Sequence, residues 1–541
     1  MYRLAPRRGP LLAAVATLAA VGVAGLVAGL AGFADPAATR PDVHITVSGV
    51  ADHSLLGAAG RDHLQLHVHA TGISAKDLSA TVDGRPIALS AVGRAGDYLL
   101  IPGRLADGAH LIAVQNVLLH LTVDTTPPTL AMTMPTRPLP INAGVTVTGR
   151  LENATDTLTA PGGRVAVRGV DFTVSYPLPP MGAKITATDL AGNATVRTIN
   201  VPTVYPTTIR AVHMTGAAWG YAPLRDPVLR LIQQHRINAV QLDIKDEDGI
   251  VNFDAPVPLA HQDGAIFGYY DARQVTRQLH ALGARVIGRE VTFNDSKLAD
   301  WAWSHGHRDW VIQTPAGAPY TYGYRHSHFA NFANSHARDY ELAIARAAAA
   351  AGFDDVIFDY IRRPDGPISS ERFPGLPAGP AAEPAAERAI AGFAQQAQAM
   401  LRPLGASVGA AIFAQAATRP QDTAQNVPLM ARHLDVVVPM DYPSHWNHGE
   451  YGVPDPYADP YAIVNRSLKD WLRVVRGTNC VVVPWLQDED FRGHYGPQQV
   501  IAQINGTRAD GIPGWLMWSA TATYTGAAFS PDAPKAYTPR A

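Results

Sequence analysis

The amino-acid sequence predicts a multidomain protein in which β-sandwich modules are followed by an α/β domain, a (β/α)8 TIM barrel. Three observations support this fold class. The chain has 541 residues, which is more than one compact domain usually contains. Between residues 35 and 205, short runs alternate apolar with polar residues and are separated by turn pairs such as Asp83-Gly84. From residue 206 onward, apolar runs alternate with helical patterns, which is typical of β/α units.

Residues 1–34 are predicted to be a targeting segment. Arg3, Arg7 and Arg8 precede an apolar run at residues 11–33 that contains no charged residue. At about 1.5 Å per residue, a helix of this length can cross a hydrocarbon core about 30 Å thick. The basic residues before the run predict that the rest of the chain lies outside the cell membrane. The segment is either a membrane anchor, which its length favours, or a cleaved signal peptide, so the protein is expected to be extracytoplasmic, membrane-anchored or secreted.

Residues 35–126 and 127–205 are predicted to form two β-rich modules. They meet at Pro127-Pro128, because proline has no N–H group for a strand ladder. In the first module, His63, His67 and His69 are spaced two or four residues apart among apolar positions, so we expect them on the solvent face of a strand. The second module resembles bacterial immunoglobulin-like modules, both in Pro127-Pro128 and in the turn Asp189-Leu190-Ala191-Gly192-Asn193 before its last strand.

The barrel is predicted over residues 206–530, with a tail at 531–541. Its eight candidate strands are residues 209–213, 239–244, 285–291, 355–360, 407–413, 434–441, 480–485 and 514–518. Helical patterns lie between them, at residues 227–235, 272–282, 337–351, 385–401 and 461–475. Five glycines fall between a helix and the next strand, where a positive φ closes a helix: Gly283, Gly352, Gly405, Gly477 and Gly511. A doubly wound sheet is the alternative fold, but no glycine-rich phosphate loop follows any strand.

Composition and charge exclude several classes of function. The net charge is -2 and no run is rich in lysine or arginine, so nucleic acid is not an expected partner. The single cysteine, Cys480, excludes an internal disulfide and a cysteine-based metal site. His326-Ser327-His328 lacks a zinc-ligand spacing, and no Gly-x-Ser-x-Gly elbow is present. The sequence therefore predicts no metal, no cofactor and no esterase triad.

Polar residues follow the apolar strands of the barrel at their C-terminal ends. Asp243 comes directly after Val240-Gln241-Leu242, and Asp359 comes directly after Val356-Ile357-Phe358. Because the C-terminal ends of barrel strands meet at one mouth, these carboxylates can converge. Hydrolysis of a glycosidic bond needs one carboxylic acid to protonate the leaving oxygen and a second carboxylate as nucleophile or base. With tryptophan and tyrosine interleaved, the pattern predicts a glycoside hydrolase.

Three carboxylates are the predicted catalytic residues. Asp359 is expected to be the nucleophile or to stabilise the transition state, Asp488 to be the general acid/base, and Asp243 to tune or position them. Asp246, Glu247 and Asp248 precede Gly249 in a turn-like run and are expected to be solvated. The predicted substrate-binding residues are Arg362, Tyr360, Tyr442, His445, Trp446, Trp485, Gln487, Trp518, Glu290 and Asp441.

Five motifs at strand ends carry a family resemblance that covers about residues 207–525. They are Leu242-Asp243-Ile244-Lys245-Asp246, Phe358-Asp359-Tyr360-Ile361-Arg362, Met440-Asp441-Tyr442-Pro443-Ser444-His445-Trp446, Pro484-Trp485-Leu486-Gln487-Asp488 and Gly514-Trp515-Leu516-Met517-Trp518. The barrel resembles the bacterial family labelled "putative glycosyl hydrolase domain", which is similar to other retaining (β/α)8 glycosidases. The resemblance implies that Asp243, Asp359, Tyr442, His445, Gln487 and Asp488 line a sugar site. Glu290 and Asp441 stand where the family has apolar residues, so either could add a carboxylate to the site.

The sequence thus predicts an exported glycoside hydrolase that acts on a cell-envelope or extracellular polysaccharide. The N-terminal apolar segment would attach it to the membrane. The alternatives are a non-catalytic, lectin-like carbohydrate-binding protein and an envelope scaffold in which the β modules do the binding. The sequence leaves open which carboxylate is the acid and whether the configuration at the anomeric carbon is retained.

Overall fold

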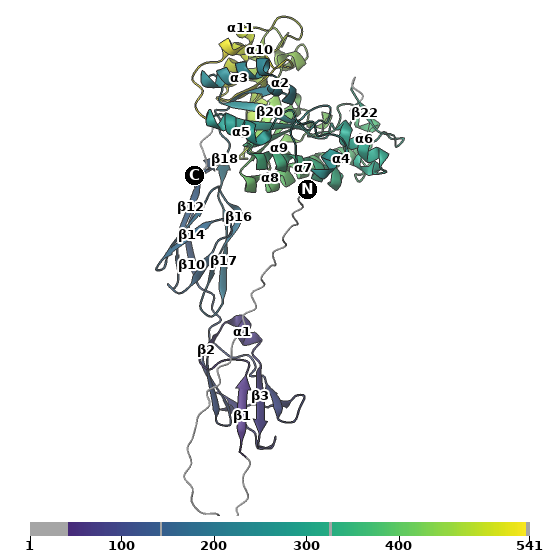
Figure 1. Ribbon diagram of the computed structural model, residues 1–541. Helices are drawn as coiled ribbons and strands as arrows, with labels where there is room; N and C mark the ends of the chain where they lie inside the picture. Colours follow the sequence, from purple (N-terminus) through teal and green to yellow (C-terminus); the bar gives the residue numbers. More distant parts are fainter. Residues whose placement is uncertain (1–41, 141–142, 324–326, 537–541) are drawn as a thin grey trace, which may run out of the picture. The chain divides into compact units, whose positions relative to one another are not determined.

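The computed structural model, drawn in Figure 1, describes residues 42–140, 143–323 and 327–536. These residues belong to two compact units. The boundary lies between Val123 and Asp124, apart from residues 57–59, which belong with the second unit. The predicted N-terminal targeting segment lies outside the described residues. Within those residues, no helix has both the length and the apolar character needed to cross a membrane.

The first unit consists of two sheets around an apolar core. One sheet has the order β1 (His44–Ser48), β3 (Leu66–Thr71), β7 (Asp97–Leu100), β6 (Ser90–Ala91). The other has the order β2 (Ser54–Leu56), β9 (Val117–Val123), β8 (Gly108–Val114), β4 (Ala80–Val82), β5 (Arg85–Pro86), and α1 (Ala58–Asp62) follows β2 in the chain. Leu66 and Val68 of β3 are buried, whereas His67 and His69 lie on its solvent face as predicted. His63 is also exposed, but it lies in a turn before β3 and not on the strand.

A second β module precedes the barrel. Its four-stranded sheet has the order β10 (Leu130–Thr133), β12 (Val145–Leu151), β15 (Asp171–Tyr176), β14 (Arg164–Arg168). A three-stranded sheet has the order β13 (Thr157–Thr159), β16 (Met181–Thr188), β17 (Ala194–Asn200), and β11 (Leu139–Pro140) pairs with β18 (Thr203–Val204). Val147, Val174, Ile185 and Ile199 are fully buried in its core. The β structure expected from the sequence is therefore present. The immunoglobulin-like resemblance stays a prediction.

Eight parallel strands close into the predicted barrel. Their order is β19 (Arg210–Met214), β20 (Ala239–Lys245), β21 (Arg285–Val291), β24 (Asp355–Asp359), β25 (Ser407–Phe413), β26 (Val436–Met440), the two-part strand β27 (Val481–Val482) and β28 (Trp485–Gln487), and β29 (Trp515–Trp518). β29 pairs with β19, which closes the sheet. The seventh strand, predicted as one run, is divided near Pro484, because proline offers no N–H to the ladder. All eight predicted strands are confirmed.

Helices fill the crossovers between these strands (Figure 1). They are α2 (Gly216–Gly220), α3 (Ala222–Gln233), α4 (Pro258–Gln262), α5 (Ala272–Ala281), α6 (Ser296–Ser304), α7 (Ser335–Ala351), α8 (Ala382–Leu401), α9 (Val427–Met430), α10 (Pro460–Val474) and α11 (Pro497–Ala509), with the hairpin β22 (Thr321–Tyr322), β23 (Ser327–His328) between α6 and α7. All five predicted helix-closing glycines have positive φ, from 75° at Gly283 to 107° at Gly352.

Alternation along each strand decides which side chains face the barrel interior. In β21, Ile287 packs in the small apolar core inside the barrel, whereas Val286 packs in the larger core beneath the helices. Arg289 follows Ile287 by two residues, so it faces the interior at the C-terminal mouth. Glu290 is one residue further and faces outward. The end of β21 therefore supplies one charged group to the mouth and another to the layer of helices.

Candidate functional site

A cavity of about 820 Å³ lies at the C-terminal mouth of the barrel. Seven predicted site residues line it: Asp359, Tyr360, Arg362, Tyr442, His445, Trp485 and Trp518. The other polar and aromatic residues of its wall are Glu247, Arg289, Tyr322, Asp365, Phe413, Gln415, Arg419, Asp422, Thr423, Asn447 and Phe491. The remaining predicted residues do not line the cavity, and their surroundings are described below.

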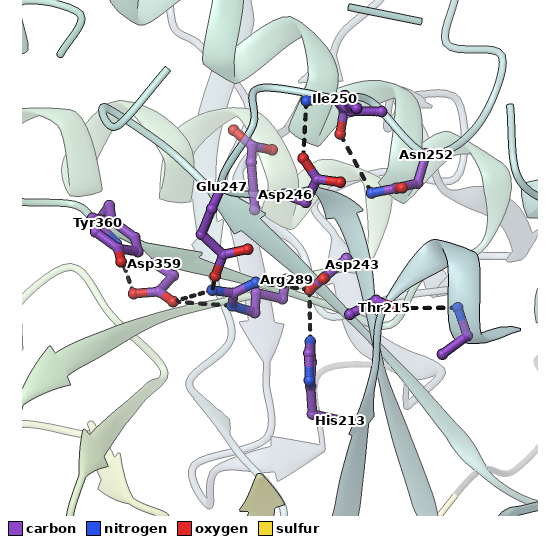
Figure 2. A network of polar contacts seen from close by, with 12 residues as sticks. His213, Thr215, Asp243, Asp246, Glu247, Ile250, Asn252, Arg289, Asp359 and Tyr360 are labelled. Carbon is purple, nitrogen blue, oxygen red and sulfur yellow. Dashed lines mark hydrogen bonds and ion pairs between the residues drawn. The ribbon is translucent and has the colours of Figure 1, made fainter. Parts of the chain in front are cut away.

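One guanidinium group holds three carboxylates at the mouth (Figure 2). Arg289 donates to Asp359 Oδ2 from Nε at 2.9 Å and from Nη2 at 2.7 Å. Its Nη1 donates to Asp243 Oδ1 at 3.0 Å, and Nη2 also donates to Glu247 Oε1 at 2.5 Å. Burial alone would lower the pKa of Arg289, but the charges of Glu247, Asp243 and Asp359 raise it well above its usual value. The group therefore stays cationic and fixes the three carboxylates relative to one another.

Asp243 is fully buried and does not line the cavity. Its Oδ1 also contacts His213 Nε2 at 2.8 Å, and Tyr270 donates its hydroxyl to the Asp243 carbonyl at 2.8 Å. Burial would raise the pKa of Asp243, but the charges of His213 and Arg289, together with their hydrogen bonds, lower it. Asp243 is thus a buried, charged partner that orients Arg289.

Asp359 and Glu247 both face the cavity and share one nitrogen of Arg289. Because Nη2 lies 2.7 Å from Asp359 Oδ2 and 2.5 Å from Glu247 Oε1, these two oxygens are at most about 5.2 Å apart, the sum of the two lengths. Asp359 Oδ1 accepts the backbone N–H of Tyr360 at 2.8 Å, and Tyr360 has a left-handed φ of 50°. The sequence predicts Glu247 to be solvated, and its side chain is 37% exposed. Its position on the cavity wall was not predictable from a turn-like run of acidic residues.

Asp246, the neighbour of Glu247, stabilises the turn between residues 246 and 250. Its Oδ1 accepts the backbone N–H groups of Asp248 at 3.1 Å and Ile250 at 3.0 Å, and Figure 2 shows it pointing away from Arg289. Burial raises its pKa to about 7, and the charges of Asp243 and Glu247 add to the rise. The predicted solvated turn is therefore half-buried at this residue.

Asp488, the predicted general acid/base, is held away from the cavity. Its two oxygens accept the backbone N–H and the hydroxyl of Thr525, both at 2.7 Å. Burial raises its pKa, and the hydrogen bonds from Thr525 oppose the rise. The contacts fix the segment after β29 to the end of β28. The structure thus does not bring Asp488 to the lining that contains Asp359.

Asp441, Trp446 and Gln487 also lie outside the cavity lining. Trp446 Nε1 donates to Asp441 Oδ1 at 2.9 Å, and Ser467 of α10 donates to the other oxygen at 2.5 Å. Burial raises the pKa of Asp441 to about 7. Gln487 accepts the backbone N–H of Ser444 at 3.1 Å, so it positions the loop that carries Tyr442 and His445. The hydrogen bonds of these three residues hold the segments next to the cavity in place and do not reach into it.

Glu290 belongs to a second buried charge cluster, between the barrel and α7. Lys245 donates to Asp295 Oδ2 at 2.7 Å and to Glu341 of α7. Burial raises the pKa of Glu290 to about 8; the charge of Lys245 opposes the rise and that of Asp295 adds to it. The extra carboxylate near the end of β21 therefore faces α7 and is not part of the cavity wall.

Aromatic rings form much of the wall. Tyr442 and Trp518 stack with ring centroids 5.3 Å apart and an interplanar angle of 26°. The Arg289 guanidinium lies 5.6 Å from the Trp485 ring centroid. Burial lowers the pKa of His445, and the charge of Arg492 lowers it further, so His445 is neutral at pH 7. A cavity with charged groups at its base and rings on its sides suits a polar ligand that has flat apolar faces.

One protein family matches the barrel, and several solved structures are similar to the chain. A family model described as "Putative glycosyl hydrolase domain" matches residues 211–524. No curated protein matches the chain. A hypothetical protein from Ruminiclostridium thermocellum ATCC 27405 is 26% identical over 37% of this chain and 96% of that chain, with a TM-score of 0.32. The glycoside hydrolase domain of PgaB (BpsB) from Bordetella bronchiseptica is 16% identical over 60% of this chain and 96% of that chain, with a TM-score of 0.45. The α-galactosidase TtGalA from Thermus thermophilus is 14% identical over 77% of this chain and 73% of that chain, with a TM-score of 0.37.

Proposed function

The chain belongs to the family described as "Putative glycosyl hydrolase domain", and from this premise we propose that its barrel hydrolyses glycosidic bonds of a polysaccharide. The observation that carries the proposal is the pair Asp359 and Glu247. Both carboxylates line a cavity with aromatic walls, and their nearest oxygens on Arg289 are at most about 5.2 Å apart. Retaining glycosidases have carboxyl groups about 5–5.5 Å apart, whereas inverting enzymes need about 6.5–9.5 Å. The limit of about 5.2 Å applies to one oxygen of each carboxyl group, and on it we base the proposal that the configuration at the anomeric carbon is retained.

We assign the nucleophile to Asp359. Three N–H groups, two from Arg289 and one from Tyr360, donate to its oxygens and hold the carboxylate at the cavity wall. In the first step Asp359 attacks the anomeric carbon, and the bond from this carbon to the leaving oxygen breaks. In the second step water attacks the same carbon and releases Asp359. Arg289 holds the carboxylate in place throughout.

We assign the general acid/base to Glu247, in place of Asp488. Glu247 lines the cavity and is partly exposed, so it can reach a leaving oxygen, whereas both oxygens of Asp488 are bound to Thr525. In the starting state Glu247 would carry a proton on Oε2, the oxygen that does not accept from Arg289, and would give it to the leaving oxygen in the first step. It would then take a proton from the attacking water in the second step, which restores the starting state.

The stacked rings of Tyr442 and Trp518 would bind the apolar faces of sugar rings. We further propose an extracytoplasmic location and an envelope or extracellular polysaccharide as substrate. Both rest on the basic and apolar N-terminal segment of the sequence.

The test is reducing-end release from a panel of envelope and extracellular polysaccharides by the purified protein. We expect Asp359→Asn to abolish release and Glu247→Gln to lower it by about 10²–10⁴-fold, the usual contribution of general acid/base catalysis. Glu489→Gln is the matched control, because Glu489 is a partly buried carboxylate at the end of β28 that accepts the backbone N–H of Ala520 at 2.8 Å. If Glu489→Gln lost release while Glu247→Gln kept it, the general acid would be Glu489 and not Glu247. Saturable binding without release from any polysaccharide would instead support a lectin.

A further inference from the structure

Three side chains of the first unit converge on its surface. Asp52 and His53 lie in the turn before β2, and His120 lies on β9, with which β2 pairs in parallel. The His53 N–H donates to the His120 carbonyl at 2.7 Å, and the His120 N–H donates to Asp52 Oδ1 at 2.6 Å. These backbone contacts fix the turn against the strand. One potential ligand atom from each of the three residues lies within 4.8 Å of the others.

The ligand atoms are already near metal-binding distances from one another. His53 Nε2 lies 3.5 Å from Asp52 Oδ2, and His120 Nδ1 lies 3.1 Å from Asp52 Oδ1. Metal bonds of about 2.0–2.1 Å in a tetrahedron place neighbouring ligand atoms roughly 3.3 Å apart. The two imidazole rings are stacked, with centroids 5.0 Å apart and planes at 6°. Rotation of these exposed rings about their side-chain bonds can direct both nitrogens to one point.

The apolar core of the unit does not require these three side chains. The side chains of His53, Asp52 and His120 are 77%, 44% and 51% exposed, so none contributes to the core. His53 has a φ of 59°, in the left-handed region that a histidine adopts at some cost.

We propose that Asp52, His53 and His120 bind one divalent transition-metal ion of the zinc class. Two imidazoles and one carboxylate form a common zinc-ligand set, and they leave a fourth position for water or for a ligand from another molecule. The bound ion would link the turn before β2 to β9. The site is separate from the barrel and does not depend on the function proposed for it.

Two other histidines in the same unit provide matched controls. His69 pairs with Asp97 at 2.6 Å and His110 pairs with Asp83 at 2.7 Å, and each pair contains one imidazole and one carboxylate. In the part of the chain that the structure describes, only the Asp52 cluster joins three potential ligands. A single imidazole–carboxylate pair is a weak zinc site, so loss of His69 should leave the proposed binding intact.

The experiment is calorimetric titration of the full-length protein, purified in detergent without a histidine tag, with Zn²⁺ at pH 7.5. We expect one site that Mg²⁺ does not fill, because Mg²⁺ prefers oxygen ligands. His120→Ala and His53→Asn should each weaken this site at least about tenfold, and His69→Ala should not. Asparagine suits position 53 because it tolerates positive φ. Circular dichroism spectra matching the wild type would show that each variant is folded.

Lowering the pH to 5.5 should also release the ion, since imidazole must be deprotonated to bind it. Titration curves in which wild type, His120→Ala and His53→Asn bind Zn²⁺ equally would overturn the proposal. So would the absence of a Zn²⁺ site in the wild type.

Discussion

Replacement of Arg289 by lysine tests the centre of the proposed active site. The substitution keeps the positive charge and removes the planar fork that reaches three carboxylates. Arg289 makes four hydrogen bonds, two to Asp359, one to Asp243 and one to Glu247. A single ammonium group cannot reproduce this geometry, so at least two of the four bonds are lost. Hydrogen bonds to charged groups contribute about 1.5–3 kcal/mol each, which gives about 3–6 kcal/mol in total.

We expect this loss to appear mainly in kcat. If about 3 kcal/mol of it raises the activation barrier, kcat falls roughly 150-fold. KM should change less, because the aromatic walls that would bind the sugar are untouched. The assay is steady-state release of reducing ends at saturating substrate. A kcat within threefold of the wild-type value, in a folded variant, would refute the role given to Arg289.

Arg285→Lys is the matched control for this experiment. Arg285 lies on the same strand, β21, and also forms a buried forked ion pair, with Asp355 at 2.8 and 2.6 Å. It is at the opposite end of the strand from the cavity. We expect Arg285→Lys to lower the free energy of unfolding while leaving kcat close to that of the wild type. Equal losses of kcat in both variants would show that the effect of Arg289→Lys is a general loss of barrel stability.

Three further predictions concern the charge clusters and the cavity wall. The folded protein holds the proton of Glu290 up to about pH 8, whereas the unfolded chain releases it near 4.5, so stability should fall as the pH rises between these values. For this proton the free energy of unfolding falls by at most about 1.4 kcal/mol per pH unit. Urea unfolding at pH 5 and pH 8 should therefore show a smaller difference in the free energy of unfolding for Glu290→Gln than for the wild type. Asp488→Asn should accelerate proteolysis of the segment around Thr525 and lower kcat less than Glu247→Gln does; a larger loss of kcat would return the acid to Asp488. Trp518→Ala should raise KM by about tenfold for oligosaccharides, measured by initial rates, because one stacking surface is lost. An unchanged KM would show that sugar does not contact this ring.

Local patterns in the sequence were sufficient to predict the barrel. Each of its eight strands is an apolar run, and each predicted helix-closing glycine has the positive φ that only glycine adopts at little cost. The proximity of Asp243 and Asp359 was also predictable, and both accept hydrogen bonds from Arg289. Both follow three apolar or uncharged residues near the ends of their strands, and parallel strands of a barrel end at the same mouth.

The tertiary structure decided how the remaining charged residues are used. Arg289 and Glu290 are neighbours in sequence, yet strand alternation directs one to Asp359 and the other to the cluster around Lys245. Asp488 was predicted as the acid from its place after a strand, but its oxygens bind Thr525, 37 residues later in the chain.

Glu247 was predicted to be solvated, and only the position of Arg289 on the adjacent strand brings it to the cavity. The sequence by itself therefore determined which residues form strands, helices and turns, because those choices depend on neighbours within a few positions. Which carboxylate meets which partner depends on contacts between distant segments, and only the closed barrel sets those distances.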